Sequence, residues 1–197
     1  MKSRILVFLA LSICGVSGVL YADQSGAKFP TLCRSDEFAY LNAKMSTYVW
    51  DDQHQPGKPA YTLKKNGKLL SLCADRDAEP LRKLTYRYGE VGKNEFEYTA
   101  TEKHKFYISY EQDGPHGGSN VLFFHVGEFT YYVTEATGDG HGIGIQVFKE
   151  GARISNLFSG TSHGVDYVSG LFAINFNMPS SPIFAESDPE NDIWHFR

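Results

Sequence analysis

Three histidines in this chain stand directly before a glycine and could ligate a metal ion: His116, His141 and His163. If loops at one end of a sheet brought them together, Asp139 or Asp166 could complete a set of two histidines and one carboxylate. No two of these residues have the local spacing that fixes a pair of zinc ligands, as H-E-x-x-H does. The sequence therefore favours solvent-exposed loop histidines and predicts no bound metal or cofactor. A metal-dependent hydrolase is the alternative.

Four glycines alternate with other residues in 137-TGDGHGIGIQVF-148. A phosphate-binding loop would need a helix directly after it, because its backbone N–H groups gather at a helix N-terminus. Here the apolar residues from Ile143 to Val147 recur at every second position, which is typical of a strand. We therefore expect a β-hairpin arm in which Gly142 and Gly144 share one face, so that a ring or a neighbouring backbone can come close. A mobile loop that binds a partner is the alternative interpretation.

No other catalytic pattern stands out in the sequence. Ser159 and Ser169 each precede a glycine, but neither lies in the G-x-S-x-G pattern of a nucleophilic serine. Glu95 and Glu97 are two residues apart, which in a strand places both carboxylates on one face, usually a solvated one. The residues therefore favour a protein that is not an enzyme.

Residues 1–22 have the pattern of a secretory signal peptide. Two basic residues precede an apolar run from Ile5 to Leu20, and the small residue Ala22 follows. Lipidation of Cys14 is an alternative to simple cleavage. The pattern predicts a periplasmic or secreted protein, with residues 23–197 forming a single β-rich domain.

The two cysteines beyond the leader are Cys33 and Cys73. In an oxidising compartment two cysteines are expected to pair, so we predict a disulfide between them. A pair of buried free thiols is the alternative. The two cysteines lack the C-x-x-C spacing of a thioredoxin-like redox site.

The chain is acidic, with 19 Lys and Arg against 23 Asp and Glu, and loss of Lys2 and Arg4 with the leader makes it more so. Nucleic acid and anionic membranes are poor partners for such a surface. No apolar run after the leader is long enough to span a membrane. The sequence leaves the oligomeric state open.

Period-two alternation of aromatic and β-branched residues predicts an all-β fold: an antiparallel meander, sandwich or small barrel with one disulfide. Asn66 and Gly67 predict a type I′ hairpin turn within 61–74, and a second hairpin is expected around 89–94. Further strands are expected at 84–88, 95–99, 105–111, 121–126, 129–135, 143–149 and 152–158. The segment 36–45 could be strand or helix, and 75–83 is expected to be an irregular connection. The chain beyond Phe158 is expected to be an irregular C-terminal tail, docked by Ile193, Trp194 and Phe196.

The chain has 12 tyrosines and 14 phenylalanines, which suits a recognition surface as well as a β fold. Tyr131 and Tyr132 must lie on opposite faces of one strand, so we expect one of the two rings to point outward. With the loops 112–120 and 136–142, these observations give His116, Tyr132, Asp139 and His141 as candidate binding residues.

The runs 67-GKLLSLCADRD-77 and 84-LTYRYGEVGKNEFEYT-99 resemble a widespread group of small exported proteobacterial proteins without an assigned activity. The positions that carry this resemblance are Lys68, Ser71, Leu72, Cys73, Tyr86, Arg87, Gly89, Gly92, Lys93 and Glu95. The likeness covers roughly residues 31–160 and departs at Phe158, where the group tends to carry a further cysteine. It implies a fold and export, but no catalytic residues.

A looser likeness runs to periplasmic lysozyme inhibitors and to interbacterial immunity proteins, although the S-G-x-x-Y loop of the inhibitors is not found here. We therefore expect a non-catalytic periplasmic or secreted binding protein with a protein partner. It would plausibly act as an inhibitor or immunity protein against an envelope-directed hydrolase. The alternatives are the metal-dependent hydrolase and an envelope structural protein.

Overall fold

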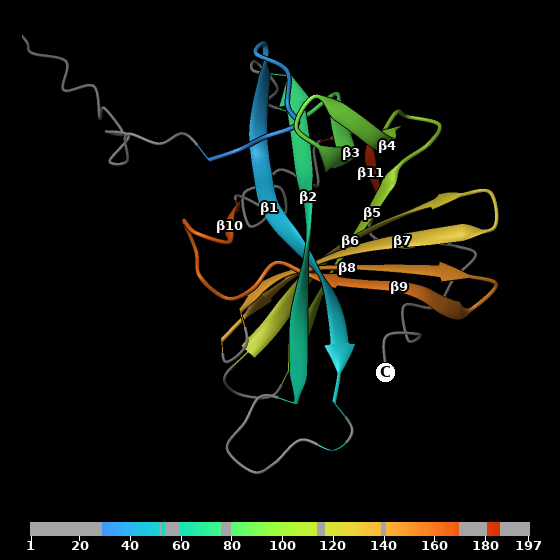
Figure 1. Ribbon diagram of the computed structural model, residues 1–197. Coiled ribbons are helices and arrows are strands. Elements are labelled where there is room, and N and C mark those ends of the chain that lie inside the picture. Colours follow the sequence, from blue (N-terminus) through green and yellow to red (C-terminus); the bar gives the residue numbers. More distant parts are fainter. Residues whose placement is uncertain are drawn as a thin grey trace, which may run out of the picture.

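A computed structural model describes residues 29–51, 53, 60–75, 80–113, 117–138, 141–169 and 181–185. The predicted signal peptide, Cys14 and the residues expected to dock the tail lie outside this part of the chain. Within it the structure consists of strands, turns and irregular segments (Figure 1). No helix in the described part of the chain has the length and hydropathy of a membrane span.

The described residues form one 11-stranded sheet in the order β11-β5-β6-β7-β8-β9-β1-β2-β3-β4, with β10 paired to β1. In chain order the strands are β1 (Glu37–Trp50), β2 (Tyr61–Asp75), β3 (Leu84–Glu90), β4 (Lys93–Thr99), β5 (Phe106–Asp113), β6 (Gly117–Val126), β7 (Phe129–Thr137), β8 (Gly142–Lys149), β9 (Ala152–Phe158), β10 (Tyr167–Ser169) and β11 (Phe184–Ala185). All strand pairs are antiparallel except β11 with β5. The prediction of an all-β antiparallel meander is confirmed. Segment 36–45, left open between strand and helix, belongs mainly to β1.

Two meanders, β1–β4 and β5–β9, join where Ser46 and Thr47 of β1 pair with the end of β9. The sheet curls back on itself. As a result, β3 and β4 lie over β6 and β7, although these strands are not hydrogen-bonded neighbours. Ring contacts connect the two layers: Phe96 stacks on Tyr131 at 4.7 Å between ring centroids, and Tyr98 on Phe124 at 4.2 Å. The concave face of the curled sheet holds the main hydrophobic core.

The predicted hairpin turn at Asn66-Gly67 is wrong. Strand β2 continues through both residues and pairs with β1 on either side, with a register shift between Lys44 and Ser46. Gly67 does have a positive φ, 74°, and the Asn66 side chain accepts a hydrogen bond from the Lys68 N–H at 3.0 Å. A β-bulge uses the same glycine conformation as a tight turn, so the residue pair alone cannot distinguish the two. The second predicted hairpin is confirmed: β3 and β4 turn back at Gly92, where φ is 82°.

The predicted disulfide between Cys33 and Cys73 is confirmed. It fixes the segment that precedes β1 against β2, where the Leu32 N–H also donates to Ser71 Oγ at 2.9 Å. The expected irregular tail is confirmed where it is described, since the residues after β9 form only short strands.

Beside the disulfide lies a buried ion pair. The guanidinium of Arg87, on β3, is 1% exposed and binds both carboxylate oxygens of Glu37, at 2.5 and 2.9 Å. Its Nε donates to Glu97 at 2.8 Å. Burial by itself would raise the pKa of Glu37, but hydrogen bonds from Arg87 and from the Arg34 N–H, together with the Arg87 charge, outweigh it and lower the pKa.

Candidate functional site

The structure does not assemble the histidines into a metal site in the part of the chain that it describes. His141 is exposed and its Nδ1 lies 3.1 Å from the carbonyl oxygen of Gly138, while His163 is exposed with its ring edge-on to Tyr167. Among the described residues, the one cluster with metal-ligand proximity is Cys33, Glu37 and Cys73, whose two sulfurs are bonded to each other. His116 and Asp139 lie outside the described residues.

Tyr132, a candidate binding residue, does not offer an exposed ring. It is 4% exposed and packs with Val121 and Phe123 in a second, smaller cluster, on the opposite face of the sheet from the main core. Its neighbour Tyr131 contacts the main core and is also only partly exposed. Both faces of this region are covered, so alternation along the strand does not bring either ring fully into solvent.

The glycine alternation reflects close packing, as expected for a hairpin arm. A Cβ atom on Gly142 would lie 2.5 Å from the ring of Phe158 and 2.5 Å from the Gly160 carbonyl oxygen, and its φ is 152°. A Cβ atom on Gly144 would lie 2.5 Å from Thr134 Oγ1. Ile143 and Ile145, on the other face of β8, are buried in the main core.

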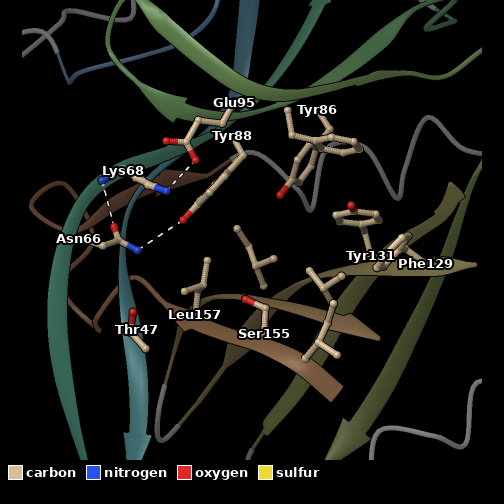
Figure 2. Close-up of a pocket in the computed structure, with 14 residues that line it drawn as sticks. Thr47, Asn66, Lys68, Tyr86, Tyr88, Glu95, Phe129, Tyr131, Ser155 and Leu157 are labelled. Atoms are coloured by element: carbon tan, nitrogen blue, oxygen red, sulfur yellow. Dashed lines mark hydrogen bonds and ion pairs between the residues drawn. The ribbon is translucent and has the colours of Figure 1, made fainter. Parts of the chain in front are cut away.

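A cleft of about 550 Å³ opens between the two layers of the curled sheet (Figure 2). One wall comes from β2, β3 and β4, and the other from β7, β8 and β9 with one residue of β1. Its lining residues are Thr47, Asn66, Lys68, Tyr86, Tyr88, Glu95, Phe96, Phe129, Tyr131, Ile145, Val147, Ile154, Ser155 and Leu157. Its size and mainly aromatic and aliphatic lining are typical of a small-molecule site.

Aromatic rings form the deep part of the cleft. Phe96 and Tyr131 stack across it with planes 7° apart, and Tyr86 lies edge-on to Phe96 at 5.8 Å. Burial raises the pKa of both Tyr86 and Tyr131 above that of a free phenol. The two hydroxyls therefore stay neutral across the physiological pH range and can take part in hydrogen bonds with a ligand.

Polar groups gather at one side of the cleft. Lys68 Nζ lies 2.6 Å from Glu95 Oε2 and 5.5 Å from the centre of the Tyr88 ring, and Asn66 Nδ2 donates to the Tyr88 hydroxyl at 3.4 Å. Figure 2 shows this chain of contacts above Leu157 of β9. The hydrogen bond to Glu95 is the largest of the effects that raise the pKa of Lys68. The ion pair therefore stands at one side of a mainly aromatic and aliphatic space.

Two β-bulges direct side chains into this cleft. In regular strands the same side chains would lie on the opposite face of the sheet. The pairs Tyr88 with Phe96 and Gly89 with Asn94 leave Glu95 without a partner in the ladder. In the same way Ile154 is left over on β9, beside Ser155. As a result Glu95 reaches Lys68 whereas Glu97 reaches Arg87, and the shared wet face expected for the two acids does not exist.

The reactive groups of the cleft are few among the described residues. Among the described lining residues, the titratable groups are the Lys68–Glu95 pair and tyrosines, and the aliphatic hydroxyls belong to Thr47 and Ser155. No histidine or second carboxylate stands beside either hydroxyl in this set, so a base that would activate a nucleophile is missing there. The sequence signal for the cleft is the alternation of aromatic residues in β3, β4 and β7. This alternation predicts the strands but does not locate the space between them.

Comparisons of this chain with protein-family models, with curated proteins and with solved structures found no match. The resemblance to the exported proteobacterial group therefore stays a prediction. The function is inferred below from the residues of the cleft.

Proposed function

We propose that this protein is a non-catalytic binding protein that holds a small, mostly apolar, ring-bearing molecule in the cleft between the two layers of its sheet. The observation that supports this most directly is the stacked pair of Phe96 and Tyr131 in the cleft lining, with Asn66 and the Lys68–Glu95 pair gathered at one side. A flat ring would extend the aromatic stack, and one polar group on the ligand would meet Asn66 or the Lys68–Glu95 pair.

We propose that the protein is located in the periplasm or is secreted. The signal-peptide pattern supports this localisation, and the Cys33–Cys73 disulfide is consistent with an oxidising compartment. The more specific prediction of an inhibitor or immunity protein stays a prediction. The loops that it assigns to the partner, 112–120 and 136–142, are described only in part.

A neutral fluorescent probe, N-phenyl-1-naphthylamine, tests the cleft because it carries fused rings and a single N–H. We expect saturable binding with a stoichiometry of one. Ser155→Trp should fill the cleft and weaken the probe's affinity by about tenfold or more. The matched control is Asn156→Trp, on the next position of β9, which faces the opposite side of the sheet and should leave probe affinity unchanged.

A second pair of variants changes exposed residues, so that a loss of probe binding cannot be explained by misfolding. Ile154 is 56% exposed at the rim and Val91 is 69% exposed in the β3–β4 turn, so neither supports the core. Ile154→Asp should weaken probe binding, whereas Val91→Asp should not. The proposal is wrong if the wild-type protein shows no saturable binding, or if the cleft variants bind the probe as well as their controls do.

A further inference from the structure

A second hollow, of about 530 Å³, lies on the opposite face of β9 from the cleft. Its lining includes Tyr48 and Trp50 of β1, Gly144 and Gln146 of β8, and Arg153 and Asn156 of β9. These residues alternate in the strands with those of the cleft, so the sheet lies between the two spaces, and Leu157 borders both. The function proposed above does not use this hollow.

Aromatic rings form one side of the hollow. Trp50 is 56% exposed, and its ring lies 6.4 Å from that of Tyr48 with planes 24° apart. Tyr48 in turn stacks on Tyr61 at 4.7 Å, with planes 22° apart. Phe158 supports both tyrosines edge-on, at 6.4 and 6.3 Å. The three rings stand nearly parallel in one stack, and the accessible Trp50 ring at its end is suited to stacking on a ligand.

The floor of the hollow is backbone and small polar groups. Gly144 has no side chain, and the position its Cβ would take lies next to Thr134 Oγ1. Gln146 follows two residues later on the same face of β8 and pairs across the strands with Asn156. A ligand resting here would therefore meet two carboxamides and a hydroxyl, which together can donate and accept several hydrogen bonds.

The charge in the hollow is positive. Arg153 is exposed and is the charged residue among the described lining residues. It forms no ion pair with a carboxylate in the described ranges. It also lies near the rings: burial is the main effect that raises the pKa of Tyr48, and the Arg153 charge acts in the opposite direction. A guanidinium with free donors binds a carboxylate in bidentate fashion.

We propose that this hollow is a second, independent binding site for an acidic saccharide. The apolar face of a pyranose ring would lie on Trp50, its hydroxyl groups would bind Gln146 and Asn156, and its carboxylate would pair with Arg153. This combination of one flat apolar surface, neutral carboxamides and a lone cation matches a sugar acid better than it matches a peptide or a lipid. The same chemistry occurs in free sugar acids and in acidic glycan chains.

The proposal is tested by calorimetric titration of the full mature protein with trigalacturonate, galacturonate and the neutral trisaccharide of galactose. We expect trigalacturonate to bind about tenfold or more tightly than the neutral trisaccharide. Galacturonate distinguishes a free sugar acid from a glycan chain as the ligand. If galacturonate binds as tightly as trigalacturonate, the site takes a single sugar acid. If galacturonate binds more weakly, the site takes a chain.

Two exposed residues supply the variants, so folding is not at risk. Trp50→Ala and Arg153→Gln should each weaken trigalacturonate binding by about tenfold, and Trp50→Phe should retain most of it. Ser155→Trp, which fills the cleft, should leave this binding unchanged, while the two hollow variants should leave N-phenyl-1-naphthylamine binding unchanged. Absence of trigalacturonate binding, equal binding of the neutral trisaccharide, or wild-type affinity in both hollow variants would overturn the proposal, whatever the outcome for the cleft.

Discussion

Replacing Arg87 by methionine should destabilise the protein severely, because it leaves a buried carboxylate without its cation. The Glu37 side chain is 4% exposed and cannot recover water, whereas Glu97 is 37% exposed and can. The cost therefore comes mainly from Glu37. Removal of one partner from a buried pair typically costs about 3–5 kcal/mol, and we expect Arg87→Met to fall in that range. A domain in the upper part of the usual range of about 5–15 kcal/mol would still fold.

The same variant should show a changed dependence on pH. In the wild type the pKa of Glu37 is lowered below 4.5, so the ion pair contributes stability above that pH, and this stability is lost as the pH falls through the folded-state pKa. In Arg87→Met burial still raises the pKa of Glu37, and only the Arg34 N–H and the Lys83 charge are left to lower it, so protonation relieves part of the penalty. The difference in stability between the two proteins should therefore be largest near about pH 7 and should shrink towards about pH 3.5.

Urea denaturation followed by circular dichroism at both pH values measures these differences. A double variant, Arg87→Met with Glu37→Gln, keeps an acceptor for the Arg34 N–H and removes the charge, so it should recover about 2 kcal/mol of the loss. Lys149→Met is the control, because the Lys149–Glu128 pair is exposed and should be worth less than about 1 kcal/mol. A loss in Arg87→Met no greater than in this control, or one that is equal at both pH values, would refute the reasoning.

Three further outcomes follow from the fold. Replacing both Cys33 and Cys73 by alanine opens a closed loop with a sequence separation of 40 and should cost about 4 kcal/mol, measured by urea denaturation; equal stability of the oxidised wild type and the variant would contradict this. Burial raises the pKa of Glu135, so the folded state holds its proton more tightly than the unfolded state, and stability should fall as pH rises from 4.5 through the folded-state pKa. Glu135→Gln should flatten that slope and raise the melting temperature at neutral pH, and an unchanged pH profile would count against it. Gly142→Ala should cost about 3 kcal/mol, because its Cβ would collide with the Phe158 ring at a strained φ, and a melting temperature within error of wild type would exclude this packing.

The strands were predictable from the sequence because their main signal is local. Alternation of aromatic and β-branched residues gave β3 to β9 close to their observed bounds, and the pairing of Cys33 with Cys73 was expected from the predicted signal peptide. The Asn66-Gly67 error has a local cause: a positive φ at glycine serves a bulge inside β2 as well as a turn. Only the pairing with β1, set by distant residues, decides between them.

The cleft and the hollow could not be predicted because both depend on long-range pairing. Joining β9 to β1 closes the two meanders into one curled sheet, and register shifts beside Glu95 and Ile154 turn these residues into the cleft. Period-two reasoning assigns every residue to a face but does not say what covers that face. For this reason it predicted that one ring of Tyr131 and Tyr132 points outward, and it overlooked the accessible Trp50.

The claim that a ligand binds between the two layers of the sheet is tested most directly by methyl NMR during titration with N-phenyl-1-naphthylamine. Ile145, Val147 and Leu157 carry methyl groups in the cleft, whereas Ile108 and Val121 lie outside its lining. We predict saturable shifts of the three cleft residues with one common dissociation constant and little change at the other two. Shifts spread evenly over all five residues, or none that saturate, would contradict a binding site between the layers.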